Sequence, residues 1–145
     1  MRKITKAGLI KKLDALVKQK AFDRDGECVT CPLWIEIKKD TAKPHTPSPV
    51  MQPGHYITRG AKTVKWDMRN VYQQCRTCNF LHELHPEVMA NYVVNTLGIE
   101  GFEQLVFDGN QAKPSIHLWE LEELYNELSD SFETHDLSVA SEDTR

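Results

Sequence analysis

The chain has 145 residues, of which 40% are hydrophobic and 27% are charged, and its formal net charge is -3. The length fits one compact domain, or one small domain with helical extensions. The composition is that of an ordinary globular protein and excludes wholesale disorder and collagen-like repetition. No run approaches the roughly 20 apolar residues of a membrane span. Lysines interrupt the basic amino terminus, which argues against a signal peptide, so we expect a cytoplasmic protein without membrane contacts.

The charge is unevenly distributed along the chain. Residues 1–80 contain 16 Lys and Arg against 7 Asp and Glu, whereas residues 81–145 contain 2 against 14. Such asymmetry indicates a basic part that contacts a polyanion and an acidic part that does not. The alternative is that two solvated faces simply differ in sign.

The first half of the chain begins with a predicted helix and continues into loops. Apolar residues at spacings of three and four predict an amphipathic helix over residues 5–21, within a basic segment 1–26. Four prolines between residues 40 and 54 predict an insertion without packing of its own. Residues 55–59 are β-prone, and we expect them to open a hairpin whose connecting loop reaches residue 70.

The second half is predicted to be helical. Pro86 and Gly98 bound one predicted helix, and residues 100–107 form another short one. Residues 114–133 have apolar residues at helical spacing and outward glutamates, which predicts an acidic helix within segment 108–134. The remaining residues, 135–145, are rich in Ser, Asp, Glu and Thr and are expected to be disordered.

All four cysteines occur in two close pairs, Cys28-x-x-Cys31 and Cys75-x-x-Cys78. Two such pairs in a cytosolic protein fit a tetrahedral Zn²⁺ site, because each pair forms a tight turn and supplies two thiolates. With every position taken by sulfur, the ion would be structural. Two disulfides or a redox dithiol are the alternatives, although no thioredoxin-like pattern surrounds either pair.

Further polar residues lie in a fixed order relative to the two pairs. His55 and Asn70 lie between them, and Asn79 directly follows Cys78. This order resembles the zinc-stapled HNH, or His-Me finger, endonucleases. The resemblance implies an α+β fold, with a small zinc-stapled ββα-metal motif at residues 27–107 and flanking helices. In that family His55 would be the general base, Asn70 would orient it, and Asn79 would bind a catalytic divalent ion.

The chemistry of phosphodiester hydrolysis agrees with these roles. The reaction needs a water deprotonated near neutral pH, which suits the pKa of an imidazole such as His55. It also needs a hard cation to neutralise charge on the phosphate. The carbonyl oxygen of Asn79 suits Mg²⁺ or Mn²⁺. Taken singly, each of these residues could instead be an ordinary packing or turn residue.

A closer resemblance is to the phage NinG/Rap recombination proteins. It extends over a Cys pair, a Gly-His-Tyr sequence, an Asn and a Gln-Cys-x-x-Cys-Asn sequence, in segments 27–31, 53–61 and 69–79, with later similarity at 91–92 and 97–103. The order of cysteines is also similar to phage endonuclease VII. The resemblance implies a structure-selective endonuclease that cuts branched DNA, such as Holliday junctions, during phage recombination in a bacterial host. Phage or host recombination proteins are then expected partners.

Two positions depart from the family patterns. Many HNH enzymes place an Asp metal ligand before the catalytic His, where this chain has Gly54. After Asn79 the chain carries His82 and His85 with Glu83 between them, where the family has a different stretch. His82 is a candidate further contact to the catalytic metal, the alternative being that these histidines are ordinary helix or surface residues.

Basic residues flank the proposed catalytic site and are the expected contacts to DNA phosphates. The candidates are Arg59, Lys62, Lys65, Arg69 and Arg76. We find no recognition-helix pattern, so we expect DNA shape to be recognised and not base sequence. Two symmetric cuts in a junction would suit a C₂ homodimer.

Two alternative functions remain open at this stage. HNH nickases of ordinary duplex or single-stranded DNA share the same motif. A zinc module that binds nucleic acid without cleaving it would keep the cysteines, and the missing Asp before His55 favours it. The retention of His55, Asn70 and Asn79 together favours an enzyme.

Overall fold

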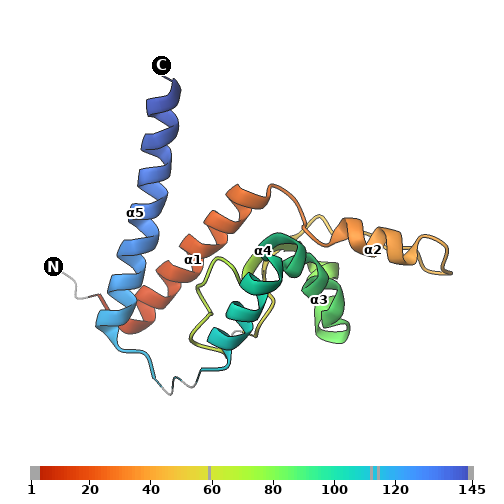
Figure 1. Cartoon of the computed structure of the whole chain (residues 1–145), viewed down its shortest axis with the longest axis horizontal. Helices are drawn as coiled ribbons and strands as arrows, with labels where there is room; N and C mark the ends of the chain where they lie inside the picture. The colour runs from red at the N-terminus through yellow and green to blue at the C-terminus, as the bar shows by residue number, and fades with distance from the viewer. Residues whose placement is uncertain (1–3, 59, 112, 114, 144–145) are drawn as a thin grey trace.

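The computed structural model describes residues 4–58, 60–111, 113 and 115–143, with side chains described as far as residue 130. This part of the chain has the mixed helical and sheet content of an α+β fold, as the sequence predicts (Figure 1). In chain order its elements are α1 (Lys6–Asp25), α2 (Cys31–Lys38), β1 (Met51–His55), β2 (Val71–Cys75), α3 (Arg76–Leu84), α4 (Pro86–Gly109) and α5 (Leu118–Asp143).

Helix α1 confirms the predicted amino-terminal helix and packs against α5. The Thr5 side chain caps its start by accepting a hydrogen bond from the backbone N–H of Gly8 at 3.0 Å, and Gly26 ends it with a φ of 74°. The buried face of α1 shares one apolar core with Leu121 of α5 and with Trp66. The acidic helix therefore covers α1 and the loop before β2.

The two strands form an antiparallel hairpin in which Met51 pairs with Cys75 and His55 pairs with Val71. The prediction of a strand over 55–59 was wrong, because the strand occupies residues 51–55 and takes in the end of the proline-rich segment. Pro53 is tolerated there because each strand of a two-stranded sheet has an open edge, where a missing N–H breaks no ladder bond.

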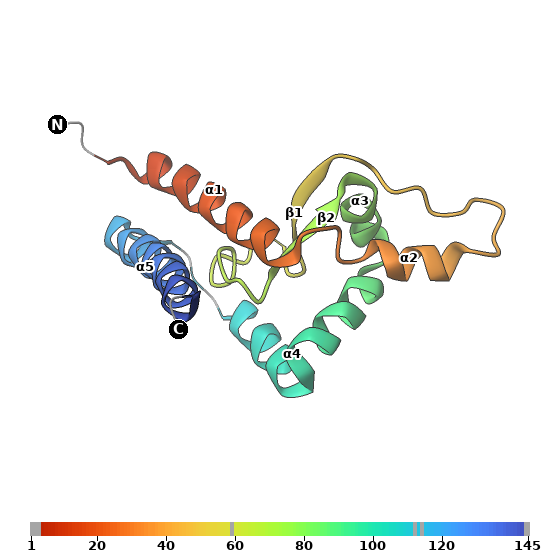
Figure 2. The ribbon, with the colours of Figure 1, turned by 90° about the horizontal axis from the view of Figure 1, so that it is seen from above.

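Helices α3 and α4 follow the hairpin directly. The Cys75 Sγ caps α3 by accepting a hydrogen bond from the backbone N–H of Cys78 at 3.4 Å. Helix α4 contains a kink at Gly98, whose φ is 79°, so the two predicted helices 86–97 and 100–107 correspond to its two arms. Seen from above, α4 bends below the hairpin, and the chain after α2 makes a wide loop back to β1 (Figure 2).

Two helical segments differ from the sequence prediction. Helix α2 was not predicted, since eight residues bounded by a cysteine pair give little periodicity. Helix α5 continues to Asp143 and so extends into the segment 135–145 that was expected to be disordered. A polar composition weakens packing, but it does not break a helix in a stretch without Gly or Pro, and neither occurs after residue 114. Within the described residues, no helix has both the length and the apolar character needed to cross a bilayer.

The packing of α5 on α1 predicts a large effect for Leu121→Ala. Leu121 is only 1% exposed in the shared core, so its truncation should lower the free energy of unfolding by about 2–5 kcal/mol. Urea denaturation followed by circular dichroism measures this. The exposed neighbour Glu122 is the matched control, and Glu122→Ala should change stability by less than about 0.5 kcal/mol. Equal effects of the two substitutions would contradict the packing.

Candidate metal centre and cavity

The four cysteines form one compact group. The sulfur atoms of Cys28, Cys31, Cys75 and Cys78 all lie within 4.8 Å of one another. Sγ of Cys31 lies 3.5 Å from Sγ of Cys75 and 3.5 Å from Sγ of Cys78. Cys28 and Cys31 lie just before and at the start of α2, whereas Cys75 ends β2 and Cys78 lies in the first turn of α3. The group therefore joins two parts of the chain that are far apart in sequence.

The donor set fits a divalent metal ion such as zinc, which binds four thiolates tetrahedrally in structural sites. All four cysteines are free thiols and are buried. The hydrogen bond between Cys28 and Cys78 lowers the pKa of the Cys28 thiol and raises the pKa of the Cys78 thiol. Burial raises the pKa of the Cys31 thiol. Without a cation the group therefore favours one thiolate and opposes further ionisation, whereas a bound cation would offset the charge of all four.

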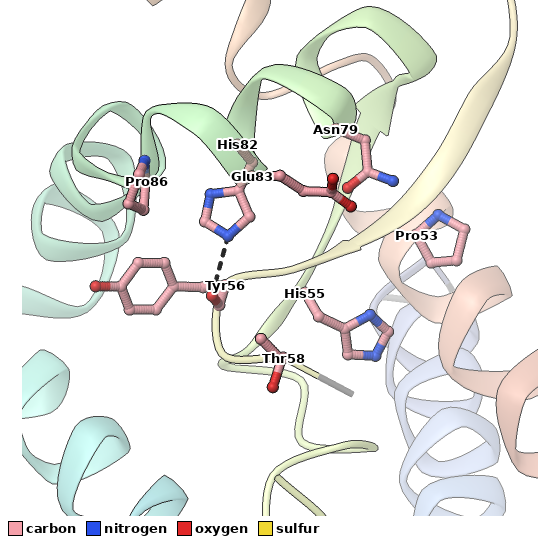
Figure 3. Close-up of a pocket in the computed structure, with 8 residues that line it drawn as sticks. All are labelled: Pro53, His55, Tyr56, Thr58, Asn79, His82, Glu83 and Pro86. Atoms are coloured by element: carbon pink, nitrogen blue, oxygen red, sulfur yellow. Dashed lines mark hydrogen bonds between the residues drawn. The ribbon is translucent and has the colours of Figure 1, made fainter. Parts of the chain in front are cut away.

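A cavity of about 400 Å³ opens between β1 and the helices α3 and α4, and one of its lining residues, Asn79, directly follows Cys78 (Figure 3). Both His55 and Asn79 line it, although they come from different elements and are separated by the whole of β2. Among the described residues, the cavity is lined by Pro53, His55, Tyr56, Thr58, Asn79, His82, Glu83 and Pro86.

The ring of His55 is fixed by a backbone carbonyl. Its Nε2 lies 2.9 Å from the carbonyl oxygen of Lys65. A carbonyl can only accept, so Nε2 carries the hydrogen and Nδ1 is the basic nitrogen of the neutral ring. An imidazole held in one tautomer by the loop opposite is suited to take a proton at Nδ1.

Asn70 is completely buried and clamps the loop that supplies this carbonyl. Its Oδ1 accepts a hydrogen bond from the backbone N–H of Ile57 at 2.7 Å. Its Nδ2 donates to the carbonyl oxygens of Ile57 and Val64, at 3.0 and 3.2 Å. Val64 directly precedes Lys65, so Asn70 connects to His55 through the backbone of the loop and not by a contact with the ring.

Asn79 lies on α3, and a hydrogen bond to a residue of β1 orients its carboxamide. Its Nδ2 donates to Oε1 of Gln52 at 2.9 Å, which leaves Oδ1 as the atom available to a cation. The carboxylate of Glu83, one helical turn further along α3, is turned toward the Asn79 side chain at the cavity (Figure 3). These two oxygen-bearing side chains form the kind of partial ligand set that Mg²⁺ or Mn²⁺ binds, with water completing the shell.

Gln74 explains why position 54 is glycine. A Cβ atom on Gly54 would lie 1.9 Å from Oε1 and 2.7 Å from Cδ of Gln74, so the buried Gln74 side chain fills the space. The Nε2 of Gln74 donates to Oγ1 of Thr30 at 2.9 Å, beside the cysteine group. An Asp at position 54 is therefore sterically excluded while Gln74 keeps this position.

His82 lines the cavity but is engaged with the hairpin. Its Nε2 lies 3.0 Å from the carbonyl oxygen of Tyr56, the contact drawn in Figure 3. Its Nδ1 is buried and has no hydrogen-bond partner among the described residues. His82 therefore binds the backbone of Tyr56, the residue after His55. The side chain that is turned toward Asn79 is that of Glu83, whereas His82 was the candidate for a further contact to the catalytic metal.

The five basic candidates have different surroundings. Arg59 lies outside the described residues. Arg69 forms ion pairs with Asp67 at 2.6 Å and with Asp108 at 2.8 Å, and these partners raise the pKa of its guanidinium. The pair with Asp108 connects the loop before β2 to α4. Lys62 and Arg76 are exposed, and the Nζ of Lys65 lies 4.8 Å from the centre of the Trp66 ring. The guanidinium of Arg69 is thus already paired with two carboxylates, and its contact with DNA stays a prediction.

Comparison with known proteins identified no relative. No family model, no curated protein and no solved structure matches the chain.

Two residues of the cavity region were not singled out for their roles by the sequence analysis. Glu83 follows Asn79 by four positions, and on a helix that spacing places both side chains on one face, so the spacing could have identified it. The position of Gln74 over Gly54 depends on the register of the hairpin, which was not predicted, since the first strand was expected at residues 55–59 and lies at Met51–His55. Nothing in the sequence reveals that contact without the register.

The contact between Gly54 and Gln74 predicts that Gly54→Ala destabilises the fold by about 1–3 kcal/mol, because the new methyl group overlaps a buried side chain. Urea denaturation of the two single variants and the double variant forms a thermodynamic cycle. In a Gln74→Ala background the three nearest obstructing atoms are gone, so the same substitution should be much less harmful, with a coupling of about 0.5–3 kcal/mol. Additive effects would show that Gln74 is not the obstacle.

Proposed function

We propose that the chain is a metal-dependent DNA endonuclease of the His-Me finger kind, stabilised by a structural zinc ion and selective for branched DNA. The observation that carries the proposal is that His55 and Asn79 line one cavity, and that Asn79 directly follows Cys78 of the four-cysteine group. An imidazole held in a single tautomer and an amide oxygen beside a carboxylate are the groups that metal-assisted phosphodiester hydrolysis requires. The resemblance to NinG/Rap proteins over residues 27–106 supplies the specific substrate class.

In the proposed reaction, Nδ1 of His55 takes a proton from a water molecule as its oxygen attacks the phosphorus atom. One phosphorus–oxygen bond to a sugar breaks, and the departing oxygen takes a proton from solvent. Asn70 acts as a positioning residue, because it holds the backbone of the loop whose Lys65 carbonyl fixes the ring. Asn79 and Glu83 would hold Mg²⁺ or Mn²⁺, which neutralises negative charge on the phosphate and on the departing oxygen.

The charge of the chain supports a nucleic-acid substrate. The exposed side chains of Lys62 and Arg76 lie in the segments before and after β2, and residues 1–80 as a whole are strongly basic. Lys and Arg contacts to phosphates supply affinity that does not depend on base sequence. Helix α5 carries acidic residues and covers α1, so we place the DNA on the side of the cavity and not on α5.

His55→Ala should reduce cleavage of a four-way DNA junction by about 10²–10⁴-fold, because the general base is lost. The assay uses the zinc-loaded full chain with Mg²⁺ or Mn²⁺, on a junction and on a linear duplex of matched sequence. Junction binding, measured by fluorescence anisotropy, should be unchanged. His117→Ala, at an exposed histidine just before α5, is the control and should cleave normally.

The same assay distinguishes the alternatives. Cleavage by the His55→Ala variant at the normal rate would identify another group as the base. Equal cleavage of junction and duplex by the wild-type chain would replace branched DNA with ordinary DNA as the substrate. Binding without cleavage of any substrate would favour a zinc module that only binds nucleic acid.

Glu83→Gln tests the cation site. The substitution keeps the shape but removes one ligand charge, so the Mg²⁺ concentration for half-maximal cleavage should rise about 10-fold, equivalent to about 1.4 kcal/mol. Glu36→Gln, at an exposed glutamate on α2, is the matched control and should leave the Mg²⁺ dependence unchanged. An unchanged Mg²⁺ dependence in the Glu83→Gln variant would remove Glu83 from the site.

A further inference from the structure

His45 makes the proline-rich segment part of the metal centre. This segment joins α2 to β1, and its residues 41–50 are exposed except for His45 and Ser48. The Nε2 of His45 lies 3.4 Å from Sγ of Cys31 and 3.5 Å from Sγ of Cys78. Both distances fit an N–H group shared between two sulfur acceptors.

The ring of His45 is also held by an aromatic neighbour. It stacks on the indole of Trp34, with ring centres 6.5 Å apart and an interplanar angle of 25°. Trp34 is only 5% exposed, and it also contacts the His85 ring at 5.7 Å and the Nζ of Lys38 at 5.4 Å. The imidazole therefore has a fixed orientation toward the sulfurs, which an unsupported loop residue would lack.

The distances distinguish a residue that hydrogen-bonds to the metal ligands from a residue that binds the metal ion itself. A ligand must lie close to all the other ligands of the same ion, and the group whose donor atoms are mutually close consists of the four cysteines. His45 contacts two of them, along the edge between Cys31 and Cys78. Metal-bound thiolates can only accept, so His45 must be the donor in these contacts.

The electrostatics of the centre call for such a donor. Four thiolates around Zn²⁺ leave a net charge of about -2 in a buried site, and N–H groups directed at the sulfurs offset that charge. The backbone N–H of Cys78 already donates to Sγ of Cys75 at 3.4 Å, from inside the fold. His45 supplies the corresponding N–H from the solvent side.

We infer that His45 is the outer-shell donor of the zinc centre, sharing its Nε2–H between the thiolates of Cys31 and Cys78 and holding the segment between α2 and β1 over them. The segment thereby shields two metal-bound sulfurs from chelators and thiol reagents. This role is independent of the proposed nuclease activity, since it concerns retention of the structural ion.

The test measures zinc release from the loaded full chain to a chromogenic chelator. His45→Ala should release zinc about 10–100-fold faster than the wild-type chain, the range typical of lost outer-shell contacts. Thr46→Ala, at the exposed neighbour in the same segment, should release it at the wild-type rate. His45→Gln keeps an N–H donor and should lie between the two, and it decides the result if His45→Ala fails to fold.

Cobalt substitution separates the two roles of a histidine. The visible spectrum of the Co²⁺ protein should be that of four sulfur ligands in the wild-type chain and in both His45 variants, with one ion per chain in each. A spectrum of three sulfurs and one nitrogen in the wild-type chain, or loss of binding in His45→Gln, would make His45 a ligand and overturn the inference. Equal zinc release from all the variants would overturn it as well.

Discussion

The mutual approach of four thiols is the interaction on which the arrangement of the cavity depends. It joins the start of α2 to the end of β2 and the first turn of α3, although 43 residues separate the two cysteine pairs. Asn79 follows Cys78 directly, so the position of α3 in this group sets the position of its carboxamide. The pairing of β1 with β2 then brings His55 to the same cavity.

A second layer of polar contacts defines the orientation of these side chains. Asn70 connects the loop after β1 to the segment before β2, and the Lys65 carbonyl in that segment fixes the His55 ring. Gln52, on β1, accepts a hydrogen bond from the Asn79 amide and so orients it. The apolar packing of α1, α5 and Trp66 supports the hairpin from the side of Val71. Local hydrogen bonds thus orient groups that the cysteines and the core bring together.

Chemical spacing in the sequence predicted more of the site than hydrophobic pattern did. The two Cys-x-x-Cys pairs identified the four-sulfur group, because such pairs form the same turn in many folds. The position of β1 was missed because Pro53 and its neighbours are typical of a loop. A proline fits in this strand because the hairpin has an open edge, where no ladder hydrogen bond is lost. His45 and Gln74 could not be recognised, since their roles follow from contacts across 14 and 20 residues that no periodicity encodes.

Metal analysis of the purified chain by native mass spectrometry tests the central claim most directly. The account predicts one zinc ion per chain, four cysteines that resist alkylation until the ion is removed, and loss of both the ion and cooperative unfolding in a Cys75→Ser variant. A chain that carries two disulfides, or a Cys75→Ser variant with unchanged zinc content and melting temperature, would contradict it.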